Sequence, residues 1–144
     1  MFNRTRKGFT LIELIIVVAV IAILASLAVY NYQRYAFRTR RADGREMLMR
    51  VASAQERYFT NFNQYAPNLG ALGFVASGPA PQAVGQSEKG YYQVAIAAMG
   101  AGNQGYTLRA TAQNAQATDQ CGNLTLDNTG AKNQSGGPTN GPCW

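Results

Sequence analysis

The chain opens on one long apolar run. From Phe9 to Val29, 21 consecutive positions hold only three polar residues, Thr10, Glu13 and Ser26. A helix of this length spans ~32 Å at the standard rise, which is about the thickness of one bilayer hydrocarbon core. A secretory signal has only about 7–15 apolar residues before a small-residue cleavage site, and the end of this run makes a poor one. The pattern therefore predicts one membrane-spanning helix.

The hydrophobic pattern then changes to an amphipathic one. Apolar residues recur at roughly helical spacing, at Ala42, Leu48, Val51, Ala52, Phe59 and Phe62. Charged residues are interleaved with them, at Arg45, Glu46, Arg50, Glu56 and Arg57. This predicts that the helix continues to about Thr60 and packs its apolar stripe against a sheet, with Gly44 as a weak point.

The remaining pattern predicts short strands. Turn residues at Tyr65–Asn68 and Ser77–Pro81 mark a loop region. Strands are expected over Tyr91–Ile96, Tyr106–Thr111 and Leu124–Asp127, with Gly100–Gly105 as a hairpin loop and a short fourth strand starting at Ala131. The predicted fold class is α+β, in which a small antiparallel sheet packs on the outer half of a long helix.

Charge is distributed unevenly. The whole chain carries +6, but Arg4, Arg6 and Lys7 precede the apolar run, which leaves 6 − 3 = +3. From Asn61 onward three basic residues, Lys89, Arg109 and Lys132, balance three acidic ones, Glu88, Asp119 and Asp127. The surplus lies on the helix between Arg34 and Arg57, where it can face lipid headgroups or acidic neighbours. Because both flanks of the apolar run are basic, the positive-inside rule does not choose an orientation.

The chain has no pattern typical of an enzyme. It contains no histidine, no cysteine beside a base, no phosphate-binding glycine loop and no close carboxylate pair in the head. We therefore expect no catalytic residue, no cofactor site and no metal site. Asp119, Asn123, Asp127 and Asn128 carry ligand atoms suited to calcium, but their spacing matches no calcium-binding loop.

Glu13 is the one ionisable residue inside the apolar run. A carboxylate within the bilayer costs about 2.5–3.5 kcal/mol, which marks such a group as functional and in need of a partner. No basic side chain lies between Phe9 and Val29. The partner must come from another chain or from a new amino terminus made by cleavage near Gly8. An α-amine at Phe9 would pair with Glu13 of a neighbouring subunit and set the register of the two helices.

These residues resemble a known processing motif. Gly8-Phe9-Thr10-Leu11-Ile12-Glu13, after a short basic leader and before about twenty apolar residues, is similar to the start of a type IV prepilin. The resemblance implies cleavage between Gly8 and Phe9 by a prepilin peptidase, N-methylation of Phe9, and a role for Glu13 in assembly. Other pilin subunits, the peptidase and inner membrane lipid are the implied partners.

The resemblance also implies a layout and a location. Residues 1–8 would be the leader, 9–29 the transmembrane and fibre-core helix, 30–62 its amphipathic continuation and 63–144 the head. Before assembly the N-terminus would be cytoplasmic and the head periplasmic, and afterwards the chain would be part of an extracellular fibre. Ala22 and Tyr30 stand where many pilins have glycine and proline, which predicts a more continuous helix and disfavours an abundant, stretchable shaft subunit.

The two cysteines are Cys121 and Cys143. Since the implied head lies outside the cytoplasm, we expect them to form a disulfide. It would close a loop of 21 residues and contribute about 3 kcal/mol to stability through the unfolded chain. In pilins such a disulfide bounds an exposed segment that often contacts partners, and residues 123–142 match that position.

A narrower resemblance covers most of the chain. The ordered set that carries it is Arg40–Asp43, Ala54–Phe59, Gly90–Tyr92, Gly105–Leu108, Cys121–Leu126 and Cys143-Trp144. This set is similar to the minor pilins of the PilE/ComP-like group. It implies a structural subunit of the type IV pilus that supports assembly, twitching motility and adhesion. The alternatives are a DNA-binding pilin of natural DNA uptake, a major pilin, and a type II secretion pseudopilin, whose major subunits typically use calcium near the C-terminus.

Overall fold

The computed structural model describes residues 8–79, 83–138 and 140–144. The chain forms two compact units, residues 1–35 and residues 36–144. Each unit is described by itself. One helix, α1 (Leu11–Phe62), contributes residues to both.

The first unit contains the apolar part of α1. This helix is long and apolar enough to cross a membrane by length and composition, and the apolar window is wholly unburied. Thr10 lies just before the helix, and its Oγ1 accepts a hydrogen bond from the backbone N–H of Glu13 at 3.3 Å. This is the contact that an N-cap threonine makes with the third helical residue. The helix predicted from Phe9 to about Thr60 therefore corresponds to α1.

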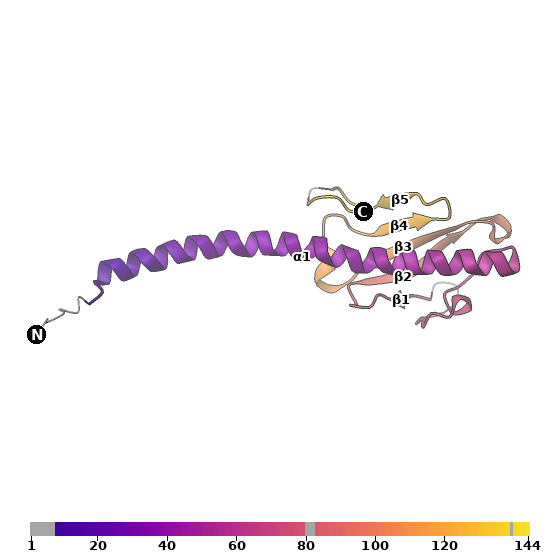
Figure 1. The fold of residues 1–144 in the computed structure, drawn as a ribbon, viewed down its shortest axis with the longest axis horizontal. Coiled ribbons are helices and arrows are strands. Elements are labelled where there is room, and N and C mark those ends of the chain that lie inside the picture. The colour runs from indigo at the N-terminus through magenta and orange to yellow at the C-terminus, as the bar shows by residue number, and fades with distance from the viewer. Residues whose placement is uncertain (1–7, 80–82, 139) are drawn as a thin grey trace, which may run out of the picture. The chain divides into compact units, whose positions relative to one another are not determined.

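The second unit contains an antiparallel sheet of five strands in the order β1-β2-β3-β4-β5. The strands are β1 (Gly85–Gln86), β2 (Tyr92–Met99), β3 (Tyr106–Ala112), β4 (Leu124–Asp127) and β5 (Lys132–Gln134). Three short 3₁₀ turns interrupt the connections, η1 (Gly70–Leu72), η2 (Ala101–Asn103) and η3 (Asn114–Thr118). Figure 1 shows the outer part of α1 lying across this sheet. The predicted α+β class is confirmed.

The four predicted strands are present, and a fifth was missed. The first strand, β1, has two residues, one of them glycine, and it pairs with β2 through Gly85 and Val94. Two residues cannot show the alternation that identifies a strand, so β1 depends on the pairing that β2 offers. The predicted hairpin loop at Gly100–Gly105 is present and contains η2.

The core lies between the outer part of α1 and one face of the sheet. Leu48 and Val51 of α1 are fully buried there. They belong to the same cluster as Val94 of β2, Leu108 of β3 and Leu124 of β4. The disulfide-bonded Cys121 and Cys143 belong to this cluster as well, so the C-terminus contributes to the core.

The predicted apolar stripe of α1 was partly wrong. Ala42 and Phe62 are exposed, whereas Arg41 and Gln55 are buried on the face that packs against the sheet. Gln55 is tolerated because its amide group exchanges two hydrogen bonds with the backbone of Ala66, at 3.0 and 2.8 Å. A hydrophobicity pattern cannot identify buried polar residues of this kind, since their burial depends on partners distant in the chain.

Gly44 has a packing role that the sequence did not reveal. A Cβ placed on Gly44 would lie 2.7 Å from two ring carbons of Tyr92, which is closer than real Cβ contacts. The Tyr92 side chain is fully buried, and its hydroxyl accepts a hydrogen bond from Gln116 at 3.1 Å. Gly44 therefore permits close approach of α1 to β2 and is more than a weak point in a helix.

Substitution of Gly44 by alanine should destabilise the head. Alanine favours a helix interior by about 1 kcal/mol over glycine, but the overpacking against Tyr92 should cost more, for a net loss of about 1–2 kcal/mol. The measurement is guanidinium unfolding of the full chain in detergent, followed by fluorescence of its single tryptophan, Trp144. Ser53→Ala is the control, because position 53 is an exposed helix site where alanine should be neutral or slightly stabilising. A stabilised Gly44→Ala variant would contradict the packing role.

Candidate assembly site and the anchored C-terminal segment

The expected processing site lies directly before α1. Gly8 and Phe9 are exposed and not helical, and Phe9 retains 84% of its accessible surface. Only Thr10 separates Phe9 from Leu11, the first residue of the helix. A peptidase needs an extended substrate backbone, so this position is chemically suited to cleavage. The residues before Gly8, with the basic leader, lie outside the described part of the chain.

Glu13 lies in the first turn of α1. The positive end of the helix dipole stabilises a carboxylate at such a position by about 0.3–1 kcal/mol. The backbone of Glu13, not its carboxylate, makes the described contact with Thr10. The full cost of a carboxylate at the bilayer centre therefore overstates the case, because Glu13 lies near one end of the apolar run. The carboxylate itself still needs a cationic partner.

The predicted disulfide is confirmed. Cys121 and Cys143 are bonded, with their Cα atoms 5.6 Å apart. Both residues are almost fully buried. The bond encloses residues 122–142, which include β4 and β5 and form the C-terminal segment discussed below.

Arg41 of α1 binds the residue that leads into this segment. Its Nε donates to Oδ2 of Asp119 and its Nη2 donates to Oδ1, both at 2.7 Å. The two side chains are each 1% exposed. Gln116 of η3 also donates to Oδ2 of Asp119, at 2.9 Å. A two-pronged pair of this geometry is the form in which a buried ion pair best offsets the cost of leaving water.

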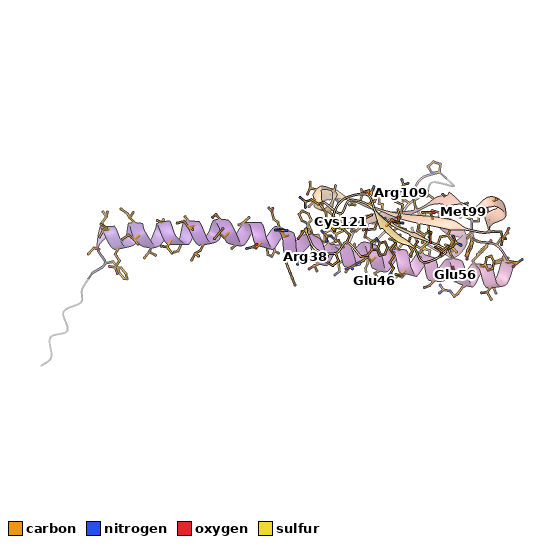
Figure 2. All side chains as sticks on the ribbon, turned by 90° about the horizontal axis from the view of Figure 1, so that it is seen from above. Arg38, Glu46, Glu56, Met99, Arg109 and Cys121 are labelled. Carbon is orange, nitrogen blue, oxygen red and sulfur yellow. A yellow bond between two sulfur atoms is a disulfide. The ribbon has the colours of Figure 1, made fainter. Side chains whose placement is uncertain are left out.

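Arg41 also binds the residues that close the segment. Its Nη1 donates to the carbonyl oxygens of Asn140 at 2.9 Å and of Pro142 at 3.1 Å. One turn earlier, the Nε of Arg38 donates to the backbone and side-chain oxygens of Asn140, at 3.3 and 3.2 Å. Figure 2 shows Arg38 and Cys121 at the same end of the head. The helix therefore holds both ends of the disulfide-bounded segment.

A second part of the head is fastened to α1 in a similar way. The carboxylate of Asp43 accepts hydrogen bonds from the hydroxyl of Ser87 at 2.6 Å and from two backbone N–H groups, those of Lys89 and Tyr91. Nearby, Nη2 of Arg50 lies 2.9 Å from carboxylate oxygens of both Glu46 and Glu88. These contacts hold the turn between β1 and β2 against the helix.

The other two carboxylates of the second unit also have partners. Glu56 accepts hydrogen bonds from the hydroxyls of Tyr65 at 3.4 Å and Tyr106 at 3.3 Å. Burial, with the nearby Glu56 carboxylate as a second cause, raises the pKa of both tyrosines. Asp127 accepts from the side chain of Thr129 and from the turn backbone, and the Thr129 hydroxyl is the main cause that lowers the pKa of Asp127.

All six side-chain carboxylates of residues 36–144 are therefore engaged within the unit. They are Asp43, Glu46, Glu56, Glu88, Asp119 and Asp127. Counting the residues from Asn61 onward predicted a neutral head, but two of its three acids pair with arginines of α1. The cations of the head proper, Lys89, Arg109 and Lys132, have no ion pair among the described residues. The head surface is consequently more basic than the count suggests.

Two of these cations lie on opposite faces of the sheet. Arg109 of β3 is exposed, opposite Thr125 of β4, and Figure 2 shows it on the side away from α1. Lys132 of β5 lies opposite the buried Leu126, hence on the side that faces the helix. Its Nζ lies 5.6 Å from the ring centroid of Trp144.

Sequence reasoning missed the most connected site residue. Arg41 was counted only as part of the surplus charge, and Asp119 was weighed only as a possible calcium ligand. The described residues contain no cluster of three or more side chains that would hold a metal ion. The one available signal was the phase of Arg41, which precedes Leu48 by seven residues and so shares its helix face.

These features define a type IV pilin: an apolar helix with an amphipathic continuation, a small antiparallel sheet packed on it, and a C-terminal disulfide. Residues 31–125 match the family described as "Type IV minor pilin ComP, DNA uptake sequence receptor", which is more than half of the chain, and the chain belongs to that family. Residues 3–29 match the prokaryotic N-terminal methylation motif. The motif and the apolar helix fit a membrane-anchored pilin that is assembled into a pilus.

Relatives are consistent with this membership. The chain is 37% identical over 73 residues to the type IV major pilin protein PilA of Myxococcus xanthus, covering 51% of this chain and 33% of that protein. It is 38% identical over 77 residues to a type IV major pilin protein PilE1 of Neisseria gonorrhoeae, covering 54% of this chain and 46% of that protein. The chain thus spans less than half the length of these relatives.

A solved structure shows the same fold. The non-core minor pilin PilV of Neisseria meningitidis superposes with a TM-score of 0.54 at 22% identity, over 76% of this chain and 94% of that one. At this level of identity the likeness establishes the architecture of helix and sheet.

Removal of the Arg41 guanidinium should expose the importance of the buried pair. Arg41→Met retains much of the volume but leaves Asp119 buried without its cation, which should cost about 3–5 kcal/mol of unfolding free energy. The double variant Arg41→Met/Asp119→Leu should recover most of that loss, because neither charge remains. The measurement is denaturant unfolding with the disulfide intact. Equal loss in the single and double variants would show that the pair is not the origin of the effect.

Proposed function

We propose that the chain is a minor structural subunit of the type IV pilus. The observation that carries this proposal is the match of residues 31–125 to a minor pilin family. The uninterrupted run of α1 through Ala22 and Tyr30 supports it, since a shaft subunit that stretches needs a segment that can melt. Twitching motility and adhesion would follow from its contribution to fibre assembly.

Maturation in this proposal begins at the exposed residues before α1. The prepilin peptidase cleaves between Gly8 and Phe9 and N-methylates Phe9, with the N-terminus cytoplasmic and the head periplasmic. Until assembly, residues 9–29 lie in the lipid of the inner membrane. On assembly these residues pack against those of other pilin subunits, while residues 30–62 and the head 63–144 stay outside the membrane.

Glu13 sets the stagger of that packing. Its carboxylate pairs with the methylated α-amine of Phe9 in a neighbouring subunit, and other registers leave both charges without a partner. The position of Glu13 in the first turn supports this arrangement, because it lies within a few residues of the amine along the chain. The pairing therefore acts between subunits that are offset by only a short distance along their helices.

Loss of the Glu13 charge should block incorporation without blocking membrane insertion. Glu13→Gln keeps the helix start but removes the charge, so its amount in sheared pili should fall more than about tenfold while its membrane level is unchanged. Mass spectrometry of both fractions gives the ratio to the dominant pilin. The wild-type chain should appear at trace level with methylated Phe9 as its first residue.

Thr10→Val is the matched control. It removes the hydrogen bond to the Glu13 backbone, at a cost of about 1 kcal/mol of helix capping, but retains the carboxylate. It should therefore incorporate nearly as well as the wild type. Normal incorporation of Glu13→Gln would refute the pairing, and a dominant wild-type chain in the fibre would make it a major pilin. A chain that never leaves the membrane would favour a secretion pseudopilin.

A second candidate function is DNA binding during natural uptake. The matched family is described as a DNA uptake sequence receptor. The specific observation in its favour is that every head carboxylate is engaged internally, whereas Lys132 is exposed beside the ring of Trp144. A cation next to an aromatic side chain can contact a phosphate and stack on a base.

A titration with duplex DNA at several salt concentrations tests this function. The full chain in detergent should bind with an affinity that falls as salt rises, and Lys132→Gln should reduce the log–log salt slope by about 0.9, the value of one phosphate contact. Arg109→Gln is the matched control, because Arg109 lies on the opposite face of the sheet. Binding that is absent or independent of salt would eliminate the DNA-binding function and leave the structural role intact.

A further inference from the structure

Cations gather at the end of the head where α1 enters it. They are Arg38, Arg40 and Arg45 of α1 and Lys89 of the turn between β1 and β2, and we refer to them as the neck patch. Arg40 is held with its guanidinium 4.9 Å from the ring centroid of Tyr91, close to Lys89 in the same turn. Lys89 is exposed. The guanidinium of Arg40 is thus fixed in position without being neutralised.

The strand register defines this end of the head. β2 begins at Tyr92, β3 ends at Ala112, β4 begins at Leu124 and β5 ends at Gln134, so the loops 87–91, 113–123 and 135–143 emerge together. Phe37 contacts this end as well, because its carbonyl oxygen accepts a hydrogen bond from Gln116 of η3. The loops at the opposite end, 100–105 and 128–131, lie far from the entry of α1.

The acidic groups at the neck end are not available to neutralise the patch. Asp119 is paired with the buried Arg41, and Glu88 is paired with Arg50. Asp43 accepts three hydrogen bonds from the turn that carries Lys89. Among the described residues, neither Arg40, Arg45 nor Lys89 forms an ion pair with a carboxylate. The neck patch therefore carries an uncompensated positive charge.

The position of the patch along α1 suggests what it meets. Arg38 and Arg40 follow Val29, the last residue of the apolar run, by 9 and 11 residues. At the standard helical rise these are ~14 and ~17 Å of helix beyond a hydrocarbon core. Headgroups occupy roughly the first 5–8 Å beyond that core, and charges act over a further ~8 Å at physiological salt. Arg57, by contrast, follows Val29 by 28 residues, or ~42 Å of helix.

We infer that the neck patch binds the phosphate headgroups of anionic phospholipids while the chain is anchored in the membrane. The inference rests on the proposed membrane-anchored state before assembly. Each juxtamembrane cation near an anionic surface is worth roughly a fivefold change in association with that surface. The contact holds the neck end of the head against the bilayer and is given up when the subunit enters the fibre.

The test compares the full chain in nanodiscs of phosphatidylcholine alone and of phosphatidylcholine with phosphatidylglycerol. Amide hydrogen exchange is followed in the turn 87–91, whose backbone N–H groups include those bonded to Asp43. We expect exchange about fivefold slower in the anionic discs, and we expect this protection to disappear in ~1 M salt, where charges act over only ~3 Å. Arg40→Gln/Lys89→Gln should abolish the lipid dependence while leaving the unfolding midpoint of the head unchanged.

The matched control removes the same charge elsewhere. Arg57→Gln/Arg109→Gln should retain the full lipid dependence, because both cations lie away from the neck end. Equal exchange in the two kinds of disc would overturn the inference, as would a lipid dependence that survives in Arg40→Gln/Lys89→Gln. Protection of the turn by duplex DNA in neutral discs, without protection by anionic lipid, would also overturn it and assign the patch to nucleic acid. None of these outcomes bears on whether Glu13 directs assembly.

Discussion

The head is held together by one buried cation. The guanidinium of Arg41 donates to both oxygens of Asp119 and to the carbonyl oxygens of Asn140 and Pro142. It thereby connects α1 to the residues just before each half-cystine of the disulfide. Burial of such a group is costly, and only a nearly complete set of acceptors makes it tolerable. Any docking of the sheet that displaced Asp119 by a few ångströms would leave a bare charge, so the pair also specifies one alignment of helix and sheet.

The disulfide and Arg41 act on the same place by different means. The covalent bond limits the unfolded chain, whereas the hydrogen bonds of Arg41 and Arg38 act only in the folded state. Because both fasten the ends of residues 122–142, the part of that segment free to vary is its exposed middle, including β5. A subunit built in this way can present a variable surface on a rigid base. That arrangement suits a protein whose C-terminal segment meets partners while its helix bears the load of assembly.

The same fold redistributes charge. Arginines of α1 take up acids of the head, Arg41 binding Asp119 and Arg50 binding Glu88. The head cations are left without acidic partners of their own among the described residues. The surface that remains has basic groups in distinct places: the neck patch, Arg109 on the outer face of the sheet, and Lys132 beside Trp144. The different partners proposed for this protein, lipid before assembly and DNA in the fibre, would meet different groups among these.

The sequence by itself determined the elements that depend on local pattern. The apolar run, the helix of which it is part, four of the five strands and the disulfide all follow from composition, period and turn residues, since each is encoded by neighbours in the chain. The N-terminal motif around Gly8, Phe9 and Glu13 was readable for the same reason, and its roles remain predictions. Tertiary structure alone decided that Arg41 and Gln55 are buried, that β1 forms, and that Gly44 makes room for Tyr92. These outcomes depend on residues 11 to 99 positions away, and a hydrophobicity pattern assigns a polar residue to solvent unless its distant partner is known.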